Sequence, residues 1–129
     1  GSNDKVFIDR RDDTKFNRSQ IINDEEVFQY LRSKGFSKCK VGQLPFKNQI
    51  HLFHNAKIII GPHGAAFANL VFCKPQTKVI EFKPFNHPTV VNKRISEINN
   101  LNYKLIESPS FKNQKGDILI DLNMLKKII

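Results

Sequence analysis

Residues 58–69, with the sequence IIIGPHGAAFAN, have the composition best suited to bind an anion. Three apolar β-branched residues precede Gly61, and small residues follow from Gly64 onward. A small-residue turn that enters a helix exposes backbone N–H groups to an anion, and Gly64 and Ala65 leave room for a close approach. His63 adds an imidazole to the same turn. We therefore expect a phosphate-bearing ligand here, with a tight structural turn as the alternative.

The turn matches neither of the common nucleotide-binding motifs. The dinucleotide pattern GxGxxG and the P-loop pattern GxxxxGK[ST] are both absent from the chain. A lone histidine in a loop is usually an ordinary hydrogen-bonded residue, which is the alternative for His63. His51 and His54 are three residues apart and could share one helical face, but no third ligand or acid lies nearby. We expect neither a metal nor a cofactor.

The distribution of charge also favours an anionic ligand. The chain has 21 Lys and Arg residues against 12 Asp and Glu residues, a net charge of +9, and no acid lies between Glu26 and Glu81. Eight cations fall in that stretch: Arg32, Lys34, Lys38, Lys40, Lys47, Lys57, Lys74 and Lys78. They attract anions, unless they are only solubilising lysines. The stretch lacks the arginine-rich, aromatic-interleaved character of a nucleic-acid surface, so we expect a small phosphorylated ligand and no specific nucleic acid.

Short apolar stretches alternate with amphipathic ones and predict the elements that position this turn. We expect strands at 6–8, 36–41, 58–60, 78–82 and 103–106, with a weak extra one at 118–120. Helices are expected at 23–35, 45–56, 65–72, 89–100 and 122–129. In the helix at 89–100 we expect the apolar residues to face the core, namely Val90, Val91, Ile95 and Ile98. This alternation predicts an α/β fold, a Rossmann-like parallel sheet with helices on both faces.

The length and composition are those of one globular domain. With 129 residues, 40% of them hydrophobic, the chain is long enough for a core but not for two full domains. Residues 1–3 look like a tag or linker remnant, and 4–129 are expected to form the domain. No apolar stretch approaches the roughly 18 residues that span a bilayer, so no transmembrane segment is expected. Cys39 and Cys73 do not make a disulfide framework, so a reducing compartment is expected.

The series of motifs resembles the carboxyl-terminal part of glycosyltransferase family 61, of the capsular polysaccharide biosynthesis type. The resemblance is carried by the buried strand, GPHGAAFANLVF, the turn CKP and the strand KVIEF. Upstream, Ile8-Asp9-Arg10, Arg18, Asn23-Asp24-Glu25 and the segment PFKNQIHLFHNA at 45–56 look like earlier motifs of the same family. Together these motifs cover roughly residues 5–85.

The resemblance implies the donor-binding half of an inverting transferase of the GT-B type, which has two Rossmann-like domains. Its partners would be a nucleotide-sugar donor, a glycan acceptor and a missing amino-terminal domain that supplies the catalytic base. The chain alone is then expected to be inactive. The resemblance also implies bacterial surface or capsular polysaccharide synthesis, in the cytoplasm or peripheral to the inner membrane. The implied donor or phosphate-binding residues are Arg10, Arg18, Gly61, His63, Gly64, Ala65, Asn69 and Glu81.

Within that set, the resemblance gives each side chain a role. His63, Gly64 and Ala65 would face the pyrophosphate, and the two arginines would offer guanidinium forks to it. Asn69 and Glu81 would support or bind the nucleoside. Alternatives stay open, because Asn69 could cap its own helix and Glu81 could satisfy loop amides. For the whole chain, the alternatives are a non-catalytic phosphate- or nucleotide-binding α/β module and, less favoured, a basic nucleic-acid-binding domain.

Overall fold

The computed structural model describes residues 4–10, 20–85, 87–108 and 117–129. Its centre is a five-stranded parallel sheet in the order β2-β1-β3-β4-β5. The strands are β1 (Lys5–Ile8), β2 (Ser37–Cys39), β3 (Ile58–Pro62), β4 (Lys78–Lys83) and β5 (Asn102–Glu107). The Rossmann-like parallel sheet predicted from the sequence is therefore confirmed.

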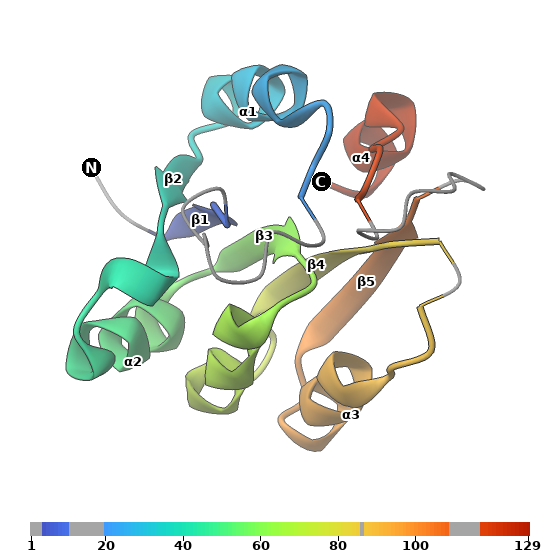
Figure 1. Cartoon of the computed structure of the whole chain (residues 1–129). Helices are drawn as coiled ribbons and strands as arrows, with labels where there is room; N and C mark the ends of the chain where they lie inside the picture. Colours follow the sequence, from blue (N-terminus) through green and yellow to red (C-terminus); the bar gives the residue numbers. More distant parts are fainter. Residues whose placement is uncertain (1–3, 11–19, 86, 109–116) are drawn as a thin grey trace.

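Helices cover both faces of the sheet. One face carries α1 (Asp24–Ser33) and α4 (Leu122–Ile128), and the other carries α2 (Phe46–Asn55), the 3₁₀ helix η2 (Ala65–Phe72) and α3 (Val91–Ile98) (Figure 1). A short 3₁₀ helix, η1 (Val41–Gln43), joins β2 to α2. Right-handed crossovers produce this distribution, because the chain reverses its direction across the sheet after β2. No helix within the described ranges is long and apolar enough to cross a membrane.

Successive residues of a strand point to opposite faces of the sheet, so alternate residues pack into two separate hydrophobic cores. Toward α1 and α4, Phe7, Ile60 and Ile80 are buried together with side chains of both helices. Toward α2 and η2, the buried strand residues are Val6, Ile8, Ile59 and Val79, packed with Phe53, Phe67 and Leu70. Because β3 and β4 are buried on both faces, they hold the loops that follow them firmly in place.

The strand order places the topological switch point of the sheet between the carboxyl ends of β1 and β3. The chain leaves β1 toward β2 on one side and leaves β3 toward β4 on the other, and ligands of open parallel sheets bind where such connections diverge. Gly61 lets the two strands approach, because a Cβ there would lie 2.7 Å from Cβ of Ile8. Arg10 follows β1 and His63 follows β3, so both lie at this point.

Several expected elements differ from those observed. The strand expected at 36–41 is only Ser37–Cys39, because Val41 already starts η1. Residues 65–72 form a 3₁₀ helix, in which small side chains let the tighter backbone pack between α2 and α3. The weak strand at 118–120 is absent from the sheet. Ile118 makes only an isolated bridge to Ile21 and is buried in the core beneath α1 and α4.

The expectation for the inward face of α3 was largely wrong. Val90, Val91 and Ile98 are 45%, 57% and 79% exposed, and only Ile95 of the four packs against a core. The buried side chains of this helix are polar, Asn92 and Ser96. The physical reason lies on β4, where the buried carboxylate of Glu81 accepts a hydrogen bond from Asn92 and so turns this polar face inward.

Candidate functional site at the carboxyl edge of the sheet

His63 and Glu81 form an ion-pair geometry at the carboxyl end of the sheet. His63 follows β3, and its Nδ1 lies 2.7 Å from Oε2 of Glu81 on β4. The backbone N–H of His63 donates to the carbonyl of Phe82 at 2.7 Å, which ties the loop to the neighbouring strand. Because a carboxylate only accepts hydrogen bonds, Nδ1 carries the proton and Nε2 is the second, remaining ring nitrogen.

Glu81 is a buried carboxylate that accepts hydrogen bonds from three side chains. It is 2% exposed, and besides His63 it accepts from Nδ2 of Asn92 at 2.6 Å and from the Tyr103 hydroxyl at 2.5 Å. Burial alone raises the pKa of Glu81, but the bonds from His63, Tyr103 and Asn92 outweigh burial and lower that pKa below its ordinary value. We call His63, Glu81, Asn92 and Tyr103 the His63–Glu81 network.

The pKa of Tyr103 is also shifted, by its own burial and by its contact with Glu81. Burial raises the pKa of the Tyr103 hydroxyl, and the hydrogen bond to the Glu81 carboxylate and its negative charge raise that pKa further. The hydroxyl therefore keeps its proton and stays a donor. Both carboxylate oxygens of Glu81 accept hydrogen bonds from protein side chains, so this glutamate supports His63. The resemblance had left open whether Glu81 would support the site or contact the nucleoside itself.

Arg10 reaches the same loop from the end of β1. Its Nη1 donates to the backbone carbonyl of His63. Its side chain runs so close to Gly64 that a Cβ there would lie 2.7 to 2.9 Å from Nε, Cζ and Cδ of the arginine. The guanidinium of Arg10 therefore contacts the loop that bears the His63 imidazole, at the switch point. Both are donors of the kind that bind phosphate oxygens.

His87 is a site residue that the sequence interpretation missed. Its ring packs against that of His63, with 4.5 Å between centroids and a tilt of 47°. Burial lowers the pKa of His87, and the charges of His63 and Lys83 lower it further, with Glu81 opposing them. The available signal was its position just after β4, since residues that follow parallel strands meet at one edge of the sheet.

The other predicted residues have different surroundings. Asn69 is buried on η2, where Nδ2 donates to Oε1 of Gln49 at 2.9 Å and to the carbonyl of Ala66 at 3.2 Å, so it joins η2 to α2. Ala65 is exposed at the start of η2, and Arg18 lies outside the described residues. The structure thus brings together five predicted residues at one edge, namely Arg10, Gly61, His63, Gly64 and Glu81.

The acid-free stretch does not by itself create this site. Lys38 is paired with Asp24, and both side chains are almost buried. Lys57 lies 3.6 Å from Asp4, at the opposite, amino end of the sheet. Both acids lie outside residues 27–80, so a charge count along the sequence could not detect the pairing. The cationic side chains at the carboxyl edge are Arg10 and Lys83.

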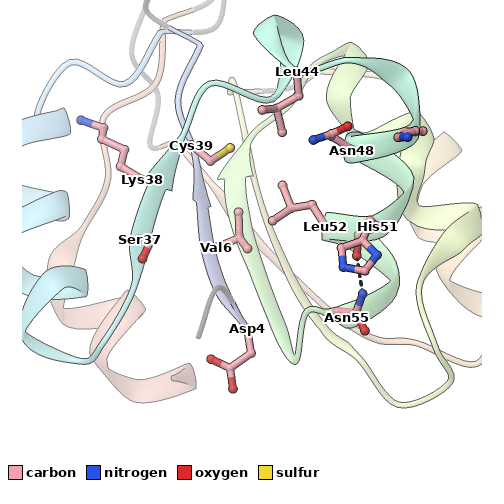
Figure 2. A pocket seen from close by; sticks show the side chains of 11 residues that line it. Asp4, Val6, Ser37, Lys38, Cys39, Leu44, Asn48, His51, Leu52 and Asn55 are labelled. Carbon is pink, nitrogen blue, oxygen red and sulfur yellow. Dashed lines mark hydrogen bonds between the residues drawn. The ribbon is translucent and has the colours of Figure 1, made fainter. Parts of the chain in front are cut away.

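A groove of about 830 Å³ lies elsewhere, between the edge strand β2 and α2. Figure 2 shows side chains of β1, β2 and α2 converging on it, with Val6, Cys39 and Leu52 on its apolar wall. None of the predicted donor-binding residues lines the groove. We assign the candidate site to the carboxyl edge because the convergent donors and the buried carboxylate lie there and do not line the groove.

Comparison with known proteins identifies the family of this chain. The family model for glycosyltransferase 61 matches residues 2–80. A beta-1,2-xylosyltransferase (RCN11) of Oryza sativa subsp. japonica is 28% identical over 118 residues, which cover 84% of this chain and 22% of that protein. A beta-1,2-xylosyltransferase of Arabidopsis thaliana is 32% identical over 77 residues, covering 50% of this chain and 14% of that protein.

The match extends through β3 and the loop that bears His63, and it ends at Ile80, one residue before Glu81. This chain spans less than a quarter of the length of either curated relative. The family model matches well over half of the chain, so the chain belongs to glycosyltransferase family 61.

Proposed function

We propose that this chain is the nucleotide-sugar-binding half of an inverting glycosyltransferase with GT-B architecture. The observation that carries the proposal is the convergence of Arg10 and His63 on one loop at the β1/β3 switch point. Ligands of open parallel sheets bind at that point, and a guanidinium beside an imidazole suits a diphosphate. Gly64 contributes to this arrangement, because its missing side chain leaves the space in which the guanidinium lies.

In an inverting transfer, the acceptor hydroxyl oxygen attacks the anomeric carbon from the face opposite the diphosphate. The bond to the new acceptor oxygen forms as the bond to the phosphate oxygen breaks, and a base takes the acceptor proton. Negative charge then builds on the leaving diphosphate, and fixed donors around it lower the barrier. Arg10, His63 and the N–H groups after Gly64 would supply those donors, while the acceptor and its base belong to a further domain.

The relatives guide the choice of ligand. Both are named as β-1,2-xylosyltransferases, so a uridine diphosphate sugar carrying xylose is the first donor to test. Both come from plants, and the bacterial capsular role and the cytoplasmic location implied by the resemblance stay predictions. The acceptor and the activity of the whole protein are likewise part of this proposal.

Nuclear magnetic resonance titration with uridine diphosphate tests where the ligand binds. We expect the amides of residues 61–66 to shift first, followed by the side-chain signals of Arg10 and His87. Shifts confined to residues 47–55 would place the ligand in the groove beside α2 instead, and shifts confined to 108–115 would also overturn the assignment. Equal affinity for inorganic pyrophosphate would favour the non-catalytic phosphate-binding module.

A thermal scan and a transfer assay test whether this chain binds the donor without transferring the sugar by itself. Ligand at about ten times its dissociation constant adds RT ln 11, about 1.4 kcal/mol, to the free energy of unfolding, or a few degrees in Tm. We expect that shift with uridine diphosphate and no sugar transfer by the chain alone. Absence of a shift with uridine, guanosine and cytidine diphosphates would reject donor binding, and efficient transfer would show that the base lies within these 129 residues.

A further inference from the structure

The His63–Glu81 network fixes the hydrogen-bonding state of the His63 ring. Glu81 accepts from Nδ1, so within the described part of the chain Nε2 is the ring nitrogen that no protein group occupies. The His63 side chain is 23% exposed while that of Glu81 is 2% exposed, so the ring is the outward end of a buried network. Asn92 donates to the same carboxylate oxygen as His63, and Tyr103 donates to the other oxygen, so both oxygens of Glu81 have partners.

The charges around His63 come from each element packed against it. The end of β1 contributes the Arg10 guanidinium, β4 contributes Glu81, and Lys83 and His87 follow on the same chain segment. Lys83 is buried and donates to the carbonyl of Thr89 at 2.7 Å. Glu81 is thus the anion in contact with the His63 ring, and positively charged side chains lie beside this pair. Binding of a diphosphate would add several negative charges next to the ring.

We propose that His63 takes up a proton when a nucleoside diphosphate binds, so that its ring bridges the Glu81 carboxylate through Nδ1 and a phosphate oxygen through Nε2, with Glu81 as the positioning residue. The inference rests on the proposed function, because it takes the diphosphate as the ligand. Between Glu81 and a diphosphate, the protonated form of the His63 imidazole is stabilised by two anions. Without the ligand, the ring faces one anion, Glu81, and the nearby cations Arg10 and Lys83, which stabilise the protonated form less. Binding is therefore linked to protonation.

The proton goes to His63 and not to its neighbour His87. The two rings are in contact, so a charge on one opposes a charge on the other. Of the two rings, His63 is the one with a carboxylate at hydrogen-bonding distance among the described residues. Burial and the positive charges of His63 and Lys83 lower the pKa of His87, which keeps this second ring neutral. His87 then packs against the imidazolium and shields it from water.

The first test is made on the free protein with ¹⁵N-labelled histidine rings. The neutral His63 ring is expected to carry its proton on Nδ1, whereas imidazoles free in water favour Nε2. Glu81→Gln should remove this bias, and Tyr103→Phe, which keeps the carboxylate, should weaken it. Tyr30→Phe is the matched control, because Tyr30 lies on α1, on the other face of the sheet (Figure 1). A neutral His63 ring protonated on Nε2 in the wild-type chain would overturn the positioning role of Glu81.

The second test measures protons exchanged when uridine diphosphate binds. Calorimetry near pH 7.5 in buffers of different ionisation enthalpy should show proton uptake by the wild-type chain, with Kd rising by up to about tenfold per pH unit. His63→Gln and Glu81→Gln should reduce the uptake and weaken binding about tenfold or more at neutral pH. His87→Gln and the exposed control His51→Gln should keep the uptake. Any proton change on the ligand itself is common to all variants.

The outcomes separate the inference from the function beneath it. Tight binding without proton uptake, or uptake unchanged in His63→Gln, would overturn the inference and leave the donor-binding function standing. Proton uptake that disappears only in His87→Gln would assign the proton to His87 and would also overturn the inference. Failure of the wild-type chain to bind uridine diphosphate at millimolar concentration would overturn both.

Discussion

The side chain of Arg10 occupies the space that a β-carbon at position 64 would need. An ideal Cβ on Gly64 would lie 2.7 Å from Nε and 2.8 Å from Cζ of the arginine. The backbone of Gly64 is extended, with φ at 169°, a conformation that any residue adopts. The neighbouring guanidinium, and not backbone strain, therefore requires glycine here. A loop after β3 and a residue after β1 are thus fitted to each other at the switch point of the sheet.

We predict that Gly64→Ala displaces the Arg10 side chain. Uridine diphosphate affinity should fall by about 1.5 to 3 kcal/mol if the guanidinium loses its phosphate contact. The free energy of unfolding should fall by about 1 to 3 kcal/mol, the usual cost of overpacking. Calorimetry and thermal unfolding measure the two effects. Gly42→Ala is the matched control, because a Cβ there would meet nothing within 4 Å. Unchanged affinity in Gly64→Ala would show that the arginine position is irrelevant to binding.

A second prediction compares two adjacent arginines. Side chains alternate sides along a strand, so the sequence predicts that only one of the pair faces the switch point. Arg10 contacts the His63 loop, and Arg11 lies outside the described residues. Arg10→Ala should weaken diphosphate binding by about 1.5 to 3 kcal/mol, and Arg10→Lys should recover only part, because lysine lacks the planar fork. Arg11→Ala should leave the affinity nearly unchanged. An equal loss in the two alanine variants, measured by calorimetry, would refute the assignment.

The sequence predicts an element of this fold correctly where the burial of apolar side chains determines its orientation. The run Ile58 to Ile60 is β-branched and apolar throughout, and it became a central strand buried on both faces. The helix α3 shows the opposite case. Its apolar residues Val91 and Ile98 face outward, because Asn92 turns inward to donate to the buried Glu81 carboxylate. A hydrophobic pattern cannot anticipate a helix whose inward face serves a polar group on another strand.

The same distinction applies to the site. His63, Gly64 and Arg10 could be singled out because a loop motif and the end of a strand are local features of the sequence. The packing of His87 against His63 and the bond from Tyr103 to Glu81 join residues far apart in the chain, and no local spacing encodes them. Only the register of β4 beside β5, which sets Glu81 opposite Leu105, brings that tyrosine within reach.

A third prediction concerns Asn69, which the resemblance linked to the nucleoside. In the structure its side-chain amide donates hydrogen bonds to Gln49 and to the carbonyl of Ala66. Asn69→Ala should therefore lower the free energy of unfolding by about 1 to 3 kcal/mol, because it removes the two hydrogen bonds that this buried amide donates. The affinity for uridine diphosphate should stay within a factor of two or so of wild type at a temperature where both are folded. A selective loss of nucleoside diphosphate binding, with stability unchanged, would restore the role implied by the resemblance.

The last prediction is the acid dependence of stability. The pKa of Glu81 in the folded chain lies below its ordinary value of about 4.3, because the bonds from His63, Tyr103 and Asn92 outweigh its burial. A carboxyl with a lowered folded pKa contributes stability above its unfolded pKa and loses it as the pH falls through the folded pKa. The wild-type chain should therefore lose free energy of unfolding below about pH 4.3, through protonation of this group among others.

Glu81→Gln should remove that share of the acid dependence. The variant should be less stable than wild type at pH 7, where the ionised carboxylate contributes fully. The difference between the two should shrink as the pH falls through the folded pKa of Glu81, because the carboxyl then takes up its proton. Urea unfolding at intervals between pH 3 and pH 7 measures this convergence. Glu97→Gln, at an exposed position of α3, is the control and should track the wild type throughout. A stability difference that stays constant with pH would mean that Glu81 acts through its packing and not through its charge, which would also remove the electrostatic basis for its hold on His63.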